Sequence, residues 1–293
     1  MTQAQNQPGN PLRDLPLVPF EFETVTVDRQ GQVIERRAGR AQQFVEQLGQ
    51  GILLEMVFIP GGAFWMGSRP RQGYEDETPR HYVRLEPFLL GKYPLTQQQW
   101  AAVMPWIPPY RGPGLRQPVD RVSWEDAQEF YRQLEKRTHR AYRLPSEAQW
   151  EYACRADTST PFAFGETITT DLANYVGEHT YLEEPKGIYR HGSTEVGSFP
   201  PNAFGLYDLH GNLWEWCADA WHDDYQGAPL DGSPWQGSPG ALRVVRGGSW
   251  HDPPHLCRSA CRMKFDPRER EDFVGFRLAM GLAACYPERT TAC

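Results

Sequence analysis

The fold of this chain depends most on the stretch Asn202-Ala-Phe-Gly-Leu-Tyr-Asp-Leu-His-Gly-Asn-Leu-Trp-Glu-Trp216. Its second half holds a tight Gly211-Asn212 turn that is followed closely by Trp214 and Trp216. We expect both indoles in the core, because aromatic side chains bury large apolar areas. The stretch therefore predicts a tight turn followed by two core tryptophans.

Two further stretches, Arg246-Gly-Gly-Ser-Trp250 and Gly275-Phe-Arg277, are interpreted as structural. The first predicts a strand that ends at a glycine pair, where the backbone needs a positive φ or a close approach. In the second, Arg277 is expected to pair inside the protein.

The composition is that of a folded, loop-rich protein. The 293 residues include 27 Gly and 26 Pro, which break long helices, and 10 Trp, 13 Tyr and 14 Phe, which argue against disorder. The net charge of −7 argues against a protein that binds nucleic acid by neutralising phosphates. No apolar run approaches the roughly 18 residues of a membrane helix, so we expect no membrane insertion.

The start of the chain lacks the basic-then-apolar pattern of a secretory signal. The six cysteines are therefore expected to be free thiols in a reducing compartment, and the predicted location is cytoplasmic.

The chain divides into four predicted parts: a disordered lead at 1–16, an extension at 17–50, a main domain at 51–285 and a tail at 286–293. Within the extension, alternating residues around an Asp28–Gly31 turn predict a β-hairpin, and 41–48 predicts a short helix. The extension is either a separate appendage or an edge of the main domain.

Three short helices are predicted behind the capping residues Thr96, Ser123 and Ser146, and none is predicted after Ala156. Strands are predicted at 55–59, 63–67 and 81–90, the last of them interrupted by Pro87.

The order of these motifs resembles the formylglycine-generating enzyme, or sulfatase-modifying factor, domain family over about residues 52–280. The resemblance implies an α+β fold of the C-type-lectin-like class, rich in loops, with few short helices and often with calcium. Besides the stretches quoted above, it is carried by residues 58–68, 92–100, 118–127 and 142–153.

Copper is the cofactor that the resemblance implies for the oxidases of this family, which hold Cu(I) with two cysteines. Alignment on 262–267 places those two positions at Pro254 and Ser259, so the pair is missing. Cys257 and Cys261 lie nearby, but on an extended strand they would be about 13 Å apart, too far to share one copper. We therefore interpret them as free thiols, and they are the catalytic candidates only if the chain is an oxidase.

Calcium is implied at the matching loop of the family, with Gly211, Asn212, Leu213 and Glu215 as ligands. A second family site would use Asn174 and Tyr175, but its acidic ligand falls near Ile188. His251, His255 and Cys257 could also coordinate a metal, although a polar loop explains them as well.

Two functions are compatible with these observations. The first is a binding module, expected to be a monomer, for a protein or small-molecule ligand of unknown identity. Its displayed surface would resemble that of the variable proteins of diversity-generating retroelements. The second is a copper-dependent oxidase that converts a substrate cysteine to formylglycine. The residues predicted to form the displayed surface are His251, Asp252, His255, Leu256, Cys261, Phe265 and Phe273.

Overall fold

A computed structural model describes residues 15–108, 114 and 116–282. The predicted tail at 286–293 lies outside the described residues, as does the predicted lead at 1–16 apart from its last two residues. Of these two, Leu15 is buried in the main core cluster, so the lead ends by packing against the domain.

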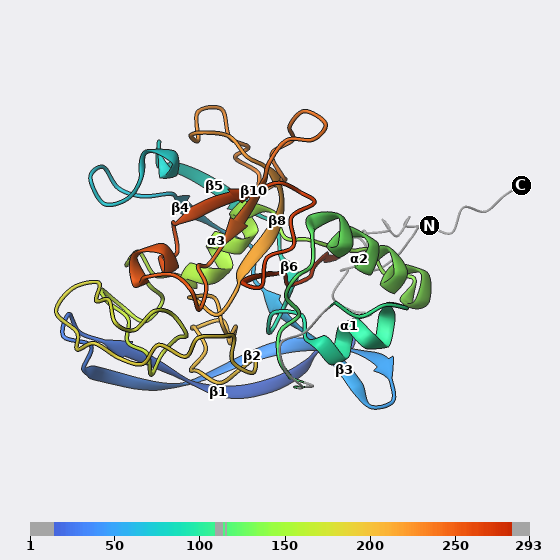
Figure 1. Cartoon of the computed structure of the whole chain (residues 1–293), viewed down its shortest axis with the longest axis horizontal. Coiled ribbons are helices and arrows are strands. Elements are labelled where there is room, and N and C mark those ends of the chain that lie inside the picture. The colour runs from blue at the N-terminus through green and yellow to red at the C-terminus, as the bar shows by residue number, and fades with distance from the viewer. Residues whose placement is uncertain (1–14, 109–113, 115, 283–293) are drawn as a thin grey trace, which may run out of the picture.

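A six-stranded antiparallel sheet forms the base of the molecule, and its first two strands make the long twisted ribbon along the bottom of Figure 1. The predicted hairpin at the start of the chain is this ribbon, and it is confirmed. In spatial order the strands are β1 (Val18–Val27), β2 (Val33–Gly49), β3 (Ile52–Ile59), β6 (Phe88–Gly91), β12 (Ala279–Gly281) and β7 (Tyr142–Arg143).

The predicted helix at 41–48 is wrong, because this segment is the second half of β2. Phe44 and Glu46 are buried whereas Val45 between them is partly exposed, which is the period of two that a strand requires. β2 pairs with β1 on one side and with β3 on the other. Residues 17–50 are therefore an edge of the main sheet and not a separate appendage.

Two smaller sheets hold the other strands of the described residues. The predicted strand at 81–90 divides at Pro87, and its halves, β5 (His81–Leu85) and β6, belong to different sheets. One sheet contains β10 (Arg262–Phe265), β9 (Arg243–Arg246), β8 (Trp214–Ala220) and β11 (Val274–Gly275), and the other contains β4 (Gly62–Met66) and β5 (His81–Leu85).

The three predicted helices are confirmed as α1 (Gln97–Val103), α2 (Trp124–Thr138) and α3 (Glu147–Arg155), each with a capping box at its first turn. Two short 3₁₀ turns, η1 (Glu75–Glu77) and η2 (Pro254–Cys257), lie in loops. None of the helices formed by the described residues has the length and apolar character that a membrane span requires.

The core lies between the sheets and the helices. Trp100 of α1 stacks on Phe130 of α2 at 5.4 Å between ring centroids, and Phe276 meets both rings edge-on. Helix α3 is buried along its whole length. A fully buried helix leaves no solvated face for polar side chains, so the carboxylates on α3 need partners inside the protein.

Candidate functional site

The first cluster of charge is the arginine core, defined here as Arg246, Arg262, Glu147 and Glu151. Arg246 Nη1 lies 2.8 Å from Glu147 Oε1, and its Nη2 contacts Glu151. Arg262 binds Glu147 through both Nε, at 2.6 Å, and Nη2, at 2.9 Å. Burial alone would raise the pKa of both carboxyls, but the neighbouring arginines hold each below its usual value. This cluster joins α3 to β9 and β10 and is structural.

A second buried pair, Glu215 with Arg277, confirms the predicted internal role of Arg277. Its Nε and Nη2 donate to the two Glu215 oxygens at 2.6 and 2.7 Å, and Trp150 Nε1 donates to Oε2 at 2.8 Å. The Glu215 carboxylate, predicted as a calcium ligand, is thus already neutralised by a guanidinium. Glu215 does not fit that role in this arrangement.

The rest of the predicted calcium loop is packed tightly. A Cβ on Gly211 would lie 2.3 Å from the carbonyl oxygen of Asn174, which explains the glycine. Asn212 Oδ1 accepts from the Thr194 amide at 2.9 Å, and Leu213 is fully buried. Asn174 Oδ1 is buried with no hydrogen-bond partner among the described residues. That oxygen is the feature here that suits a cation, and calcium stays a prediction.

The predicted copper region contains no displayed thiol pair. Pro254 and Ser259 are both buried. Cys257 and Cys261 are fully buried in two different hydrophobic clusters, and η2 rather than an extended strand leads into Cys257. Burial raises the pKa of Cys261 to about 12 and that of Cys257 well above its usual value. Both thiols are therefore protonated near neutral pH, whereas Cu(I) binds thiolates.

A third buried thiol, Cys154, lies 3.6 Å from Ser259 Oγ and 3.7 Å from His210 Nε2. His210 Nε2 accepts from the Ala163 amide at 3.0 Å, and Nδ1 donates to the Cys257 carbonyl at 2.8 Å. Burial lowers the pKa of His210 to about 4 and raises that of Cys154 to about 12. The pair is consequently a neutral thiol beside a neutral imidazole and lacks the charge of a nucleophilic site.

The predicted displayed surface is only partly displayed. Cys261 is a correction, because it is fully buried and cannot face a ligand. Asp252 accepts from Trp214 Nε1 at 2.8 Å and from Ser249, so its carboxylate holds the loop. Leu256 is partly buried against the main core. His251 and His255 are exposed.

Around His251 lies an aromatic patch, defined as Tyr189, His251, Phe265 and Phe273. Tyr189 Oη lies 3.1 Å from His251 Nδ1, and the Phe273 ring centroid lies about 6 Å from those of His251 and Phe265. Within the described ranges, no three His, Cys, Asp or Glu side chains gather as a metal site would require. The patch can offer apolar and ring contacts to a ligand.

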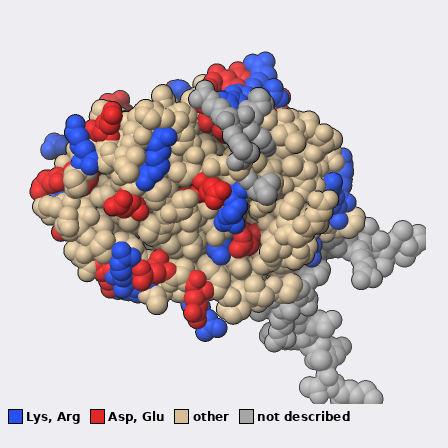
Figure 2. Space-filling view, turned by 60° about the horizontal axis from the view of Figure 1, so that its bottom comes forward, with Lys and Arg blue, Asp and Glu red and all other residues tan. Residues whose placement is uncertain are grey.

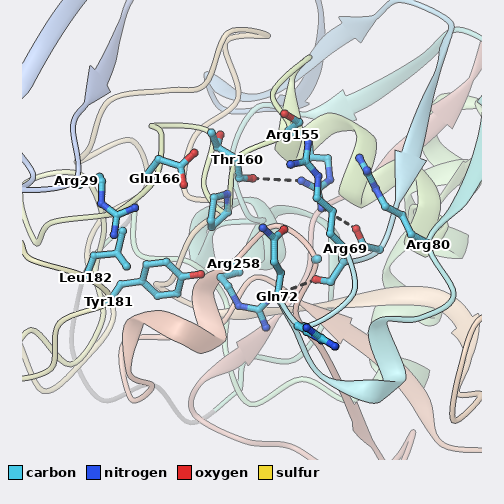
Figure 3. A pocket seen from close by; sticks show the side chains of 16 residues that line it. Arg29, Arg69, Gln72, Arg80, Arg155, Thr160, Glu166, Tyr181, Leu182 and Arg258 are labelled. Atoms are coloured by element: carbon cyan, nitrogen blue, oxygen red, sulfur yellow. Dashed lines mark hydrogen bonds between the residues drawn. The ribbon is translucent and has the colours of Figure 1, made fainter.

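Sequence reasoning missed a cavity of about 340 Å³, which we call the arginine cavity. In Figure 3, Arg29, Glu166, Tyr181 and Leu182 lie on one side of it, and Arg69, Arg80 and Arg155 lie on the other. Arg258 and Ala260 also line it, on either side of Ser259. The available signal was the density of arginine between residues 69 and 80, which the family motifs do not include.

Three of the six lining arginines face carboxylates. Arg155 Nε lies 2.8 Å from Glu151 Oε1, Arg258 contacts Glu77, and Arg29 lies 3.8 Å from Glu183. Among the described residues, no ion pair or side-chain hydrogen bond includes the other three: Arg69, Arg71 and Arg80.

Of these three arginines, Arg80 lies in the environment that is least favourable to its positive charge. Its Nε is buried without a hydrogen-bond partner, and its guanidinium lies 5.5 Å from the Trp65 ring centroid. Burial lowers the pKa of Arg80, and Arg155 and Arg69 lower it further. On the face shown in Figure 2, by contrast, basic and acidic side chains are interspersed. Arg69, Arg71 and Arg80 therefore bring positive charge to the cavity without a carboxylate at ion-pair distance among the described residues.

Comparison with known proteins finds a matching family domain and several similar proteins. The sulfatase-modifying factor enzyme 1-like domain matches residues 41–282, so the match begins inside β2. An inactive C-alpha-formylglycine-generating enzyme 2 from Bos taurus is 29% identical, over 80% of this chain and 91% of its own length. A formylglycine-generating enzyme from Streptomyces coelicolor is also 29% identical, over 76% and 88%. Overall identity therefore does not separate the active from the inactive relative.

Two solved structures share the fold. PvdO from Pseudomonas aeruginosa superimposes with a TM-score of 0.71 at 36% identity, covering 81% of this chain and 97% of that one. Treponema denticola variable protein 1 gives a TM-score of 0.68 at 24% identity, covering 82% and 99%, a likeness that shows the fold alone. The predicted C-type-lectin-like α+β fold, loop-rich with few short helices, is confirmed.

Proposed function

Since this chain belongs to the sulfatase-modifying factor enzyme 1-like domain family, we propose that it uses the family fold to bind a ligand in the arginine cavity and does not oxidise a cysteine. A cavity of about 340 Å³ lies within the size range of small-molecule sites. The proposed ligand is accordingly a small molecule.

The observation that carries this proposal is the position of Ser259. In the alignment on residues 262–267 it stands where an oxidase of the family has a copper ligand, and its neighbours Arg258 and Ala260 line the cavity. A serine hydroxyl is a poor ligand for Cu(I), which prefers thiolates. The buried, protonated Cys257 and Cys261 do not supply a substitute. The cavity therefore lies beside the position where an oxidase of the family would have this ligand, and its lining supports binding rather than copper chemistry.

Binding is tested by a thermal-shift screen of neutral, cationic and anionic small molecules, with Ser159→Trp as the blocking variant. Ser159 is exposed and lines the cavity, so an indole there fills the space without disturbing the core. We expect a ligand that stabilises the wild type and fails to stabilise Ser159→Trp. The matched control is Ser198→Trp, an exposed serine outside the cavity lining.

The aromatic patch is the alternative binding surface, and His251→Ala tests it in the same screen. If a ligand loses its effect in His251→Ala and keeps it in Ser159→Trp, binding belongs to the patch. That result contradicts the cavity as the site and returns the function to the predicted displayed surface.

The oxidase is the second candidate, favoured by the likeness to the Streptomyces coelicolor enzyme. It is tested by titrating Cu(I) and measuring oxygen uptake on a cysteine-containing peptide. We expect weak copper binding and no formylglycine. Tight copper binding that is lost in Cys257→Ser and Cys261→Ser, together with oxygen consumption, would establish the oxidase instead.

A further inference from the structure

We propose that the ligand of the arginine cavity carries a phosphate or sulfate ester, which Arg69, Arg71 and Arg80 bind. This inference rests on the proposed function, because it specifies the ligand class of the same cavity. Guanidinium groups present planar pairs of N–H donors that match tetrahedral oxyanions, and such charge-assisted hydrogen bonds are stronger than neutral ones.

The first argument is the division among the six lining arginines, of which Arg29 lies 3.8 Å from Glu183. Arg155 and Arg258 are buried, and their guanidinium groups contact Glu151 and Glu77. These two line the cavity, and the carboxylates neutralise their charge. Arg69, Arg71 and Arg80 have no such carboxylate among the described residues, and all three line the cavity. Their donors are the ones available to an anion.

The second argument is the energetic cost of the arrangement without a ligand. Arg80 lies near Arg69 and Arg155, so like charges repel, and its buried Nε lacks a hydrogen-bond acceptor. A buried donor without an acceptor costs free energy, and so does a partly desolvated charge beside like charges, which the field of Glu151 offsets only in part. A bound oxyanion would add counter-charge next to Arg80 and reduce the repulsion. The net charge of −7 makes this gathering of arginines contrary to the overall composition.

The third argument concerns the rest of the ligand. Tyr181 and Leu182 lie across the cavity from Arg69 and Arg80 (Figure 3). They can contact an apolar or planar portion of the molecule, while Ser159 and Thr160 offer polar contacts at the rim. The volume of about 340 Å³ exceeds what a free inorganic ion needs, since a water molecule occupies about 30 Å³ in the liquid. The site therefore has room for an ester as well as for its oxyanion group.

The experiment titrates the full chain with inorganic pyrophosphate, phosphate and sulfate by calorimetry at low and high salt. We expect saturable binding that weakens as salt rises, because partly exposed charges are screened. Arg69→Gln and Arg80→Gln should each weaken pyrophosphate binding by about tenfold or more. The matched control is Arg132→Gln, which removes one positive charge from an exposed site on α2 and should leave binding unchanged.

Glu166→Gln tests the sign of the ligand charge. Glu166 is an exposed carboxylate that lines the cavity, so its removal should tighten the binding of an anion and weaken the binding of a cation. Preference for inorganic phosphate over sulfate, which are similar in size and charge near neutral pH, assigns the phosphate ester, and the reverse preference assigns the sulfate ester.

Failure of this inference is distinguishable from failure of the proposed function. If no anion binds, or if Arg132→Gln weakens binding as much as Arg80→Gln, the proposal that the ligand carries an oxyanion is overturned. A neutral ligand that Ser159→Trp still excludes would leave the binding function intact. Copper-dependent oxygen uptake would overturn the proposed function itself.

Discussion

The arginine core and the arginine cavity both depend on arginine side chains, but in different ways. In the core, the buried Arg246 and Arg262 share Glu147 at hydrogen-bond distance, and Arg246 also contacts Glu151. In the cavity, Arg69, Arg71 and Arg80 lack carboxylate partners among the described residues. Arg155 links the two regions, since it binds Glu151 while lining the cavity. The difference teaches that the position of the buried α3 carboxylates decides the role of an arginine. An arginine beside them forms a structural ion pair, and one away from them can bind a ligand.

The largest effect is expected from breaking the core. Arg246→Met leaves Glu151 and Glu147 short of a partner in a fully buried site, and removing one member of a buried ion pair costs about 3–5 kcal/mol. The free energy of unfolding in urea measures it. Arg268→Met is the control, because Arg268 is an exposed arginine paired with Asp266. A loss below about 1 kcal/mol would mean that the core arginines are not structural.

Removal of calcium by a chelator tests whether Glu215 is a calcium ligand or only the ion-pair partner of Arg277. A cation bound only by the folded state at a hundredfold excess over its Kd would add about 2.7 kcal/mol, so a chelator should lower the melting temperature. Glu215→Gln should destabilise the chain with or without chelator, because Arg277 loses its carboxylate in a buried site. If Glu215→Gln alone abolishes the response to chelator, Glu215 is a calcium ligand and the pair with Arg277 is secondary.

The next largest effect is expected at acid pH, where the arginine core should lose stability. Glu147 and Glu151 have a pKa held below the ordinary Glu value of 4.5, despite burial, by their arginine partners. Their stabilising contribution is therefore complete above about pH 4.5 and is lost as the pH falls through the lowered values. The slope is at most about 1.4 kcal/mol per pH unit for each group. Urea unfolding between pH 7 and pH 3 should show a shallower acid loss in Glu151→Gln than in the wild type.

The smallest effect on stability is expected in the cavity. Arg69→Gln and Arg71→Gln change exposed side chains, so each should alter the free energy of unfolding by no more than about 0.5 kcal/mol. Either sign is informative, because relief of repulsion near Arg80 would stabilise the chain. A loss as large as that of Arg246→Met would show that the cavity arginines are structural too, and the contrast between the regions would disappear.

Local signals in the sequence determined a large part of the fold. Capping boxes at Thr96, Ser123 and Ser146 depend on residues three apart, so the three helices could be located without tertiary information. The glycine pair after Arg246 also follows from local geometry, since Gly247 and Gly248 both have positive φ. The order of the family motifs identified the fold class, and the absence of cysteine at positions 254 and 259 argued against copper.

Only the tertiary structure decided where pairing partners lie. The segment 41–48 became a strand because β3 pairs along residues 43–47 and β1 pairs along 41–43, which overrides a short helical pattern. Cys261 left the predicted surface because it packs into the main core, and Glu215 received Arg277 from 62 residues away. Whether an arginine is neutralised depends on carboxylates that are distant along the chain, and electrostatic interactions act through space. For that reason the arginine cavity emerges from the folded chain and not from its sequence.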